Sequence, residues 1–257
     1  MKYSQLKKLT VVLLLASSSR VSAQVAAAAP AQEKNNLLKI NVPALFFKNI
    51  SLQYERKTSR KNSFALAVRY RPNSTIPFQK AVENIIDDAS VNVGLFKVGN
   101  FGIIPEYRFY LGKKGAFHGF YIGPFISYNH YQGDVPINYN DYVNNASVKK
   151  TATFLGSTNS FTAGFQLGAQ WKLSDKIYLD WWILGPNYGV GNGDFNFVGS
   201  LNGFEQVSMQ YEIDKLKETL PIKVIKSKTV TENGATFKVE GPWAGIRAFG
   251  LNLGYRF

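Results

Sequence analysis

The chain ends in Phe249-Gly250-Leu251-Asn252-Leu253-Gly254-Tyr255-Arg256-Phe257, where large apolar residues alternate with small or polar ones. Because successive side chains of a β-strand point to opposite faces, this stretch predicts a strand with one apolar and one polar face. A soluble protein would bury the apolar face in its core, whereas an outer-membrane barrel would turn it toward lipid. The interpretation of the whole chain depends on that choice.

Seven earlier segments alternate in the same way, although Trp182 breaks the pattern in the last of them. These segments cover residues 38–42, 50–55, 63–70, 101–109, 120–129, 161–171 and 177–183. With the terminal strand the count is eight, an even number, as bacterial single-chain barrels require. No apolar stretch after residue 23 approaches the ~20 residues of a membrane-spanning helix, so any insertion must use strands. We therefore predict an all-β fold, an eight-stranded antiparallel transmembrane up-and-down β-barrel.

Apart from the first, which is short, the connections between these segments alternate between short and long. The short ones lie around residues 44–49, 59–62, 112–115 and 174–176, and the long ones cover 72–99, 132–159 and 191–244. Outer-membrane barrels have short periplasmic turns and long extracellular loops, so we expect three long extracellular loops. Apolar spacing predicts short helices over 204–220 and 77–90 within them. Pro105 and Pro124 lie inside expected strands, where a missing N–H interrupts the ladder, which leaves the limits of those strands open.

The first 23 residues resemble a secretory signal peptide. Lys2, Lys7 and Lys8 precede a short apolar run over 9–16, and small residues end at Ala23, where we expect cleavage. We accordingly expect a signal peptide over 1–23, a flexible lead over 24–35 and a barrel domain over 36–257. The chain has no cysteine, which excludes disulfides and thiolate metal sites. Export and strand pattern together predict the outer membrane of a Gram-negative bacterium.

Cleavage there leaves 26 basic and 17 acidic residues, a net charge of +9. The basic residues are not gathered in a stripe of the kind that binds DNA, so we expect no nucleic-acid partner. An eight-stranded barrel has an interior just wide enough to be filled by side chains. By strand parity, seven charged residues should face that interior and neutralise one another in an ion-pair network: Lys39, Glu55, Arg69, Glu106, Arg108, Asp180 and Arg256.

Catalytic chemistry has little support in the sequence. The two histidines are His118 and His130, and a lipid-modifying outer-membrane enzyme would need one of them beside a nucleophile. Ser127 is close to His130 in sequence, but the two differ in strand parity and should point to opposite faces. We expect no catalytic residue, cofactor or metal site, and keep the lipid-modifying enzyme as an alternative.

The N-terminal block Asn36-Leu37-Leu38-Lys39-Ile40-Asn41 through Ile50-Ser51-Leu52-Gln53-Tyr54-Glu55-Arg56 resembles an uncharacterised family of small outer-membrane β-barrel proteins of Gram-negative bacteria. In shape that family is similar to OmpA and OmpX barrels. The resemblance continues through Pro105-Glu106-Tyr107-Arg108-Phe109-Tyr110 and Phe120-Tyr121-Ile122-Gly123-Pro124 to the terminal strand. It implies a fold and no activity.

The terminal strand also resembles the signal by which outer-membrane barrels are recognised for assembly. The residues of this signal would be Phe249, Leu251, Leu253, Tyr255 and Phe257. It implies barrel-assembly machinery as a partner during biogenesis.

The sequence thus predicts a monomeric, non-enzymatic barrel with an occluded polar lumen. It would contact outer-membrane lipid, and serve envelope structure or bind an extracellular ligand through its long loops. A third interpretation is a secreted soluble barrel of lipocalin type, with its apolar face turned inward around a small ligand. Alternation alone does not tell the inside of a barrel from the outside.

Overall fold

The computed structural model describes residues 34–75, 93–143, 146–220 and 224–257. These residues form a single antiparallel sheet with two α-helices and one 3₁₀ turn. The strands are β1 Asn36–Asn41, β2 Ile50–Lys57, β3 Asn62–Thr75, β4 Lys97–Tyr110, β5 Gly119–Val143, β6 Ala146–Lys172, β7 Ile177–Leu184, β8 Pro186–Val198, β9 Ile225–Thr231, β10 Gly234–Ile246 and β11 Gly250–Arg256. The helices are α1 Val42–Phe46 and α3 Gly203–Thr219, and the 3₁₀ turn is Val93–Leu95.

Eight of these strands close a ring. Its order is β1-β2-β3-β4-β5-β6-β7-β11, and β11 returns to pair with β1. The closing register places Leu38 opposite Tyr255, while on its other side β11 places Leu253 opposite Leu179 of β7. All eight predicted strands are present as members of this ring, which confirms an all-β antiparallel fold with a ring of eight strands, although the described sheet has eleven strands in total. The expected signal peptide over 1–23 and nearly all of the lead lie outside the described residues.

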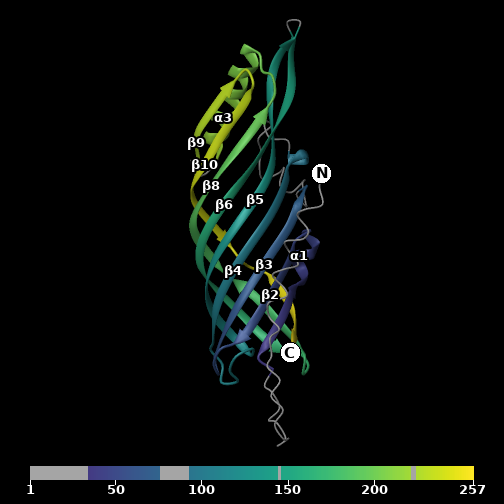
Figure 1. The fold of residues 1–257 in the computed structure, drawn as a ribbon, viewed down its shortest axis with the longest axis vertical. Coiled ribbons are helices and arrows are strands. Elements are labelled where there is room, and N and C mark those ends of the chain that lie inside the picture. Colours follow the sequence, from purple (N-terminus) through teal and green to yellow (C-terminus); the bar gives the residue numbers. More distant parts are fainter. Residues whose placement is uncertain (1–33, 76–92, 144–145, 221–223) are drawn as a thin grey trace, which may run out of the picture. The chain divides into compact units, whose positions relative to one another are not determined.

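One side of the ring continues upward as a tall wall (Figure 1). All 25 residues of β5 pair with β6, from Gly119↔Gln170 to Val143↔Ala146. Beyond the ring, β6 exchanges its partner β7 for β8, and β10 and β9 follow β8. Regular strand structure is interrupted at Gly185, between β7 and β8, and at residues 247–249, between β10 and β11, where the Arg247 N–H donates to the Gly185 carbonyl. Ring and wall are thus one continuous sheet.

Two of the three long loops expected from the sequence are instead largely strands and a helix of the wall. Residues 132–159 and 191–244 were expected to be long loops, but the first is a strand hairpin and the second holds the end of β8, α3, β9 and β10. The physical reason is a second apolar core, because inward-facing side chains of these segments have α3 to pack against. The helix expected over 204–220 is confirmed as α3. Most of the third expected loop, 72–99, and the helix expected over 77–90 lie outside the described residues.

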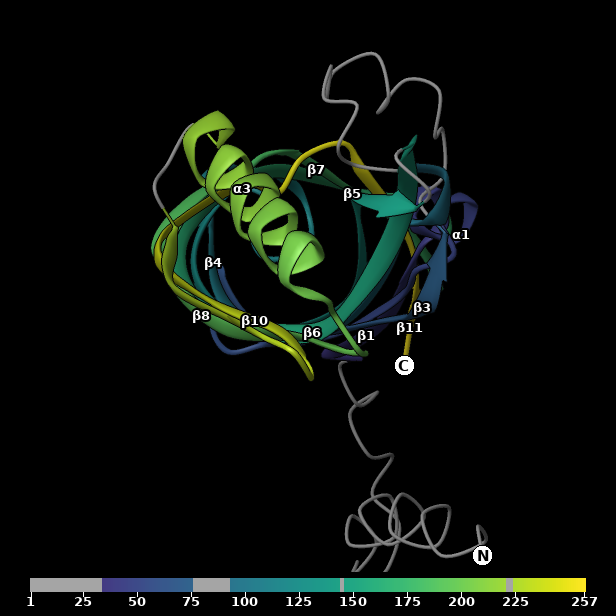
Figure 2. The ribbon, with the colours of Figure 1, turned by 90° about the horizontal axis from the view of Figure 1, so that it is seen from above.

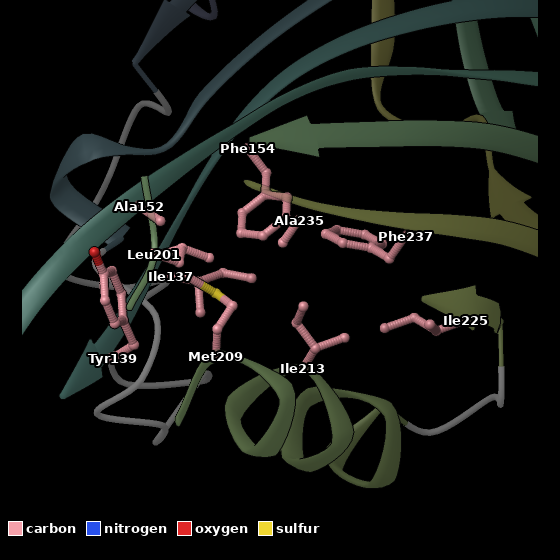
Figure 3. Close-up of a cluster of buried hydrophobic side chains, with 10 residues drawn as sticks. All are labelled: Ile137, Tyr139, Ala152, Phe154, Leu201, Met209, Ile213, Ile225, Ala235 and Phe237. Carbon is pink, nitrogen blue, oxygen red and sulfur yellow. The ribbon is translucent and has the colours of Figure 1, made fainter. Parts of the chain in front are cut away.

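The helix α3 begins with a capping box and lies across part of the ring opening (Figure 2). The Asn202 side chain accepts from the Glu205 N–H at 2.9 Å, and the Glu205 carboxylate accepts from the Asn202 N–H at 2.8 Å. This exchange satisfies two N–H groups that a helix start leaves free. Met209 and Ile213, both fully buried, project from α3 toward the wall (Figure 3). The core they enter consists of Ile137, Tyr139, Ala152, Phe154, Leu201, Ile225, Ala235 and Phe237.

The ring turns apolar side chains outward and most of its charged and amide side chains inward, where two small apolar clusters are also buried. Its exposed residues include Leu38, Leu52, Leu66, Val68, Ile103, Phe109, Ile122, Ile126, Phe161, Leu167, Trp181, Leu251 and Leu253. Its buried residues include Lys39, Gln53, Glu55, Ser63, Glu106, Arg108, Gln170, Asp180 and Asn252. No helix in the described ranges has both the length and the apolar character needed to cross a membrane.

Both prolines that left strand limits open lie within continuous strands. Pro105 pairs with Leu66 of β3, and Pro124 pairs with Phe165 of β6. Between β4 and β5, by contrast, neither proline has a partner in the register. Each proline therefore turns its missing N–H to the same seam, where the ladder is interrupted, and remains paired on its other side.

Candidate functional site

The most densely charged part of the molecule is the interior of the ring. Lys39 on β1, Glu55 on β2, Arg108 on β4 and Asp180 on β7 each alternate with outward-facing neighbours, so the pleat of four strands directs them to one place. All four are at most 1% exposed. A charge buried so completely is tolerated only when it is paired and hydrogen-bonded.

Arg108 lies at the centre of this network. Its Nη1 is 2.7 Å from Asp180 Oδ2 and 3.2 Å from Glu55 Oε2, and its Nε is 2.7 Å from Glu106 Oε1. Lys39 Nζ lies 2.5 Å from the same Asp180 oxygen and also pairs with Glu55. Two cations thus share two carboxylates, and one of those cations reaches a third carboxylate.

Neutral groups complete the hydrogen bonding of the carboxylates. Tyr110 donates to Glu55 Oε1 at 2.6 Å, and Tyr121 donates to Asp180 Oδ1 at 2.8 Å. The Arg108 guanidinium carbon also lies 4.2 Å from the centre of the Tyr121 ring, within the range of a cation–π contact. Gly168 leaves room for that ring, since a Cβ there would lie 2.3 Å from Tyr121 Cζ.

Arg247 brings the network to equal numbers of positive and negative charges. Its Nη1 lies 2.7 Å from Glu106 Oε2, and its guanidinium carbon lies 3.7 Å from the centre of the Trp182 ring. The network then holds three carboxylates, Glu55, Glu106 and Asp180, and three cations, Lys39, Arg108 and Arg247. We call these six residues the ion-pair network.

Two residues predicted for the network are not part of it. Arg69 lies on β3, donates from Nη2 to Asn129 Oδ1 at 2.8 Å, and forms no ion pair with any described residue. Arg256 lies near the end of β11, where it donates to the Lys34 carbonyl and to the Tyr178 hydroxyl. Both face the interior as parity predicts, but at levels of the ring where no carboxylate of the described residues pairs with them.

Sequence reasoning missed Arg247 because it lies in the break between β10 and β11, where strand parity gives no direction. It also missed the buried amides Gln53 and Gln170, and the hydroxyls of Tyr110 and Tyr121. A signal existed for two of these, since Gln53 has the strand parity of Glu55 and Tyr110 has that of Arg108.

The residues of the predicted assembly signal all face outward. Leu251, Leu253 and Tyr255 lie on β11, and Phe257 follows it. Phe249 precedes the strand with a left-handed φ of 56°, so it is not part of the ladder, although a strand over 249–257 was expected. Regular pairing begins only at Gly250, opposite Trp182.

The histidine and serine of the alternative enzyme do not meet. His130 Nδ1 lies 2.8 Å from Asn159 Oδ1, whereas Ser127 is buried in the interior and accepts from Asn129 Nδ2 at 2.9 Å. They lie on β5 with opposite parity. The described residues contain no group of three or more His, Cys, Asp or Glu that could hold a metal ion.

A second charged cluster fastens α3 to the tip of the wall. Lys150 Nζ lies 2.7 Å from both Asp141 Oδ2 and Glu205 Oε1, and Asn202 donates to Asp141 at 3.0 Å. The hydrogen bonds from Lys150 and Asn202 lower the pKa of the Asp141 carboxyl, and those to Asp141 and Glu205 raise the pKa of Lys150. This cluster joins β5, β6 and the first turn of α3.

The fold and the network together define a class of protein, a closed antiparallel ring with an apolar exterior and an ion-paired interior. The chain belongs to a family described as protein of unknown function, DUF3575, whose model matches residues 9–192. The match ends within β8, so α3 and β9–β11 follow it. Neither the comparison with curated proteins nor that with solved structures returned a match.

Proposed function

We propose that this protein is a non-enzymatic outer-membrane β-barrel of a Gram-negative bacterium. Its lumen would be closed by the ion-pair network, and its wall with α3 would be the extracellular part. In this proposal the ring is anchored in lipid as a monomer after export and assembly. The wall then serves envelope structure or binds an extracellular ligand or partner.

The proposal rests mainly on the distribution of side chains in the ring, which differs from that of a soluble protein. Soluble proteins rarely expose contiguous apolar patches larger than a few hundred Å². Here apolar side chains cover the outside of every ring strand, while the inside holds the ion-pair network and buried amides beside smaller apolar clusters such as Ile104 and Phe125. An outer-membrane barrel needs this pattern because lipid surrounds it. A soluble barrel of lipocalin type would have the reverse arrangement, with an apolar interior around its ligand.

The ion-pair network supports an occluded lumen. Its three carboxylates and three cations are nearly or fully buried, and each bonds to a group from another strand or from the β10–β11 break. An eight-stranded barrel has little room beyond its own side chains. A set of mutually neutralised charges across that width leaves no continuous path for water or ions.

The upper part of the molecule supports a role in contact with a partner. On α3 the side chains of Val207 and Tyr211 are 68% and 65% exposed, and Phe204 packs edge-to-face on Tyr142 at 4.8 Å between ring centres. These apolar side chains lie on the face of α3 opposite Met209 and Ile213. Exposed aromatic groups on a rigid element are typical of contact surfaces.

The lipid-modifying enzyme remains the second candidate because His130 and Asn159 lie close together at the upper rim of the ring. It predicts that His130→Ala abolishes a change in lipid A while the ring stays folded. The proposed non-enzymatic barrel predicts identical lipid A from cells with the wild-type and the variant chain, as measured by mass spectrometry.

Cell fractionation with a detergent gel of boiled and unboiled samples tests the proposal. We expect recovery in the outer membrane, faster migration of the unboiled protein, and conductance at background in planar bilayers. Recovery as a soluble periplasmic or secreted protein would contradict the membrane assignment. Single-channel conductance above background would contradict the occluded lumen.

A further inference from the structure

A side pocket lies in the side of the ring, at the break between the end of β10 and the start of β11. Residues 247–249 lie outside both strands, although the Arg247 N–H still donates to the Gly185 carbonyl at 2.8 Å, and α1 packs beside the break after Asn41 caps its first turn. The side pocket has a volume of about 390 Å³, and its lining includes Ala44, Phe47, Trp182, Ile246, Ala248 and Phe249. Ligand pockets commonly measure ≈ 300–1,000 Å³, so its size suits a small molecule.

Two arginines form the inner end of the side pocket. Arg69 and Arg247 line both this pocket and a smaller inner recess of about 110 Å³, which Ser127 and Asn129 also line. The side pocket and the inner recess also share Ile246. The inner recess has room for a compact group such as a carboxylate or phosphate, since a water occupies ≈ 30 Å³ in the liquid.

The guanidinium groups of both arginines have unused donors. Nε of Arg69 and both Nε and Nη2 of Arg247 are buried and have no hydrogen-bond partner among the described residues. The Ser51 hydroxyl, which also lines the side pocket, is buried without a partner as well. Arg247 is only 8% exposed. Buried donors left unpaired are costly, and an anion would satisfy several of them together.

The charges beside the side pocket also favour the binding of an anion. The ion-pair network is neutral by itself, with three charges of each sign, and Arg69 adds a positive charge that no described carboxylate offsets. Glu106, the network carboxylate that pairs with Arg247, also binds Arg108. A buried, uncompensated cation is stabilised by a bound anionic group.

Apart from the two arginines, Asn41, Asn49 and Ser51, the lining of the side pocket is apolar. Phe47, Ile246 and Phe249 form its rim, and Phe249 is 81% exposed with its backbone in the left-handed region, where large side chains are uncommon. An apolar rim leading to a cationic end matches a molecule with a hydrocarbon chain and an anionic head.

We propose that the side pocket binds an anionic single-chain amphiphile, with its head held by Arg69 and Arg247 and its chain lying along Phe47, Ile246 and Phe249. Carboxylate and phosphate heads share the required chemistry, since guanidinium groups bind both bidentately. This site goes beyond the proposed function and does not depend on where the ring resides, because it requires only the folded chain.

Native mass spectrometry of the full chain, released from nonionic detergent, tests this site. The ligands are palmitate and dodecyl phosphate, and the controls are dodecanol, which has no charge, and inorganic phosphate, which has no chain. We expect one-to-one adducts with palmitate, dodecyl phosphate or both, and at least tenfold weaker binding of both controls. The two anionic arms identify the head that is preferred.

Two variants and a matched control locate the binding. Arg69→Gln removes the uncompensated charge, and Ala248→Trp fills the side pocket without changing charge, so each should weaken binding about tenfold or more. Arg71→Gln removes the same charge two residues along β3, outside both cavities, and should leave binding unchanged. The gel mobility shift reports folding of each variant.

Equal binding of dodecanol, or of inorganic phosphate and dodecyl phosphate, would overturn the proposal. So would variants that bind as well as Arg71→Gln. If Arg69→Gln does not fold, Ala248→Trp decides the question alone.

Discussion

Asp180 shows at the scale of one residue how the ring tolerates charge in its interior. It accepts from Lys39, Arg108 and Tyr121, and none of these four side chains is more than 1% exposed. Replacing a whole buried ion pair by apolar groups is often neutral, whereas removing one partner is strongly destabilising. The stability of the ring should therefore fall strongly when a single charged residue of the network is replaced.

We predict that Asp180→Asn lowers the free energy of unfolding by about 3–5 kcal/mol, because it leaves Lys39 and Arg108 with one carboxylate fewer. Urea titration of the folded protein in lipid vesicles, followed by tryptophan fluorescence, measures the change. The matched control is Asp175→Asn in the β6–β7 turn, where the side chain is 96% exposed and pairs only with Lys172. That substitution should leave the free energy of unfolding nearly unchanged, because water screens an exposed ion pair. Equal effects of the two variants would contradict the role given to the network.

At this scale sequence parity predicted the facing of charged strand residues, because the period of a strand is two wherever pairing is regular. It placed Lys39, Glu55 and Asp180 on the interior face, where the structure has them. Parity could not show which levels of the ring would hold opposite charges, so it counted Arg69 in the network. Trp182 seemed to break the pattern in β7 because an interior aromatic was unexpected; it stacks on Arg247, a residue outside any strand.

At the scale of elements, α3 is held by its buried side chains and by the Asp141–Lys150–Glu205 cluster. Asp141 on β5 and Lys150 on β6 belong to the wall, and Glu205 belongs to the first turn of α3. Asn202, which caps the helix, also donates to Asp141. The start of α3 is therefore tied to a carboxyl group whose charge depends on pH.

We predict that α3 loosens from the wall as the pH falls below about 4. The pKa of Asp141 lies below its ordinary value of 3.8, so the carboxylate contributes its stabilisation fully above that value and loses it as the pH falls through the lowered folded pKa. Because the chain has no cysteine, Tyr211→Cys on the exposed face of α3 accepts a single spin label whose mobility reports docking. With Asp141→Asn added, label mobility should be higher at neutral pH and its rise below pH 4 smaller. An unchanged rise would assign the effect to another group.

At this scale, the sequence did not predict the strands of the wall. Residues 132–159 contain Pro136, Gly133 and many Asn and Thr, which are common in loops, and their apolar alternation at Val135, Ile137 and Tyr139 is short. What makes them strands is the core beneath α3, a contact over long sequence separation. The helix itself was predictable, because Met209, Ile213 and Leu216 follow a helical period by themselves.

At the scale of the molecule, ring and wall have separate cores. The ring closes through β1 and β11 around the ion-pair network, while the wall above it is held by the apolar cluster of Figure 3. Only β5 and β6 run the full height of both as unbroken strands. The ring should therefore form without the helical cover.

We predict that replacing residues 199–233 by an Asn-Gly turn leaves the ring intact. Val198 and Gly234 are already paired, so a two-residue turn can join β8 to β10 while the network is untouched. The gel mobility shift should persist, although exposed Phe154 and Phe237 should make the variant aggregate more readily. Removal of residues 250–257, which deletes β11, should abolish the shift because β1 and β7 lose their common neighbour. Loss of the shift in both variants would show that ring and wall fold only together.

The height of the β5–β6 hairpin has a mechanical consequence. Beyond Asp134, the last β5 residue paired with β4, β5 continues to Val143, so the tip stands about 30 Å along the strand past that support at ≈ 3.4 Å per residue. The hydrogen bonds that join this hairpin to its neighbours, β5 to β4 and β6 to β8, lie across the strand direction. A pull along the strands would load many of these bonds at once, in shear, rather than opening them one after another. The hairpin would therefore carry tension from its tip down into the closed ring, as a tether does, before its pairing fails.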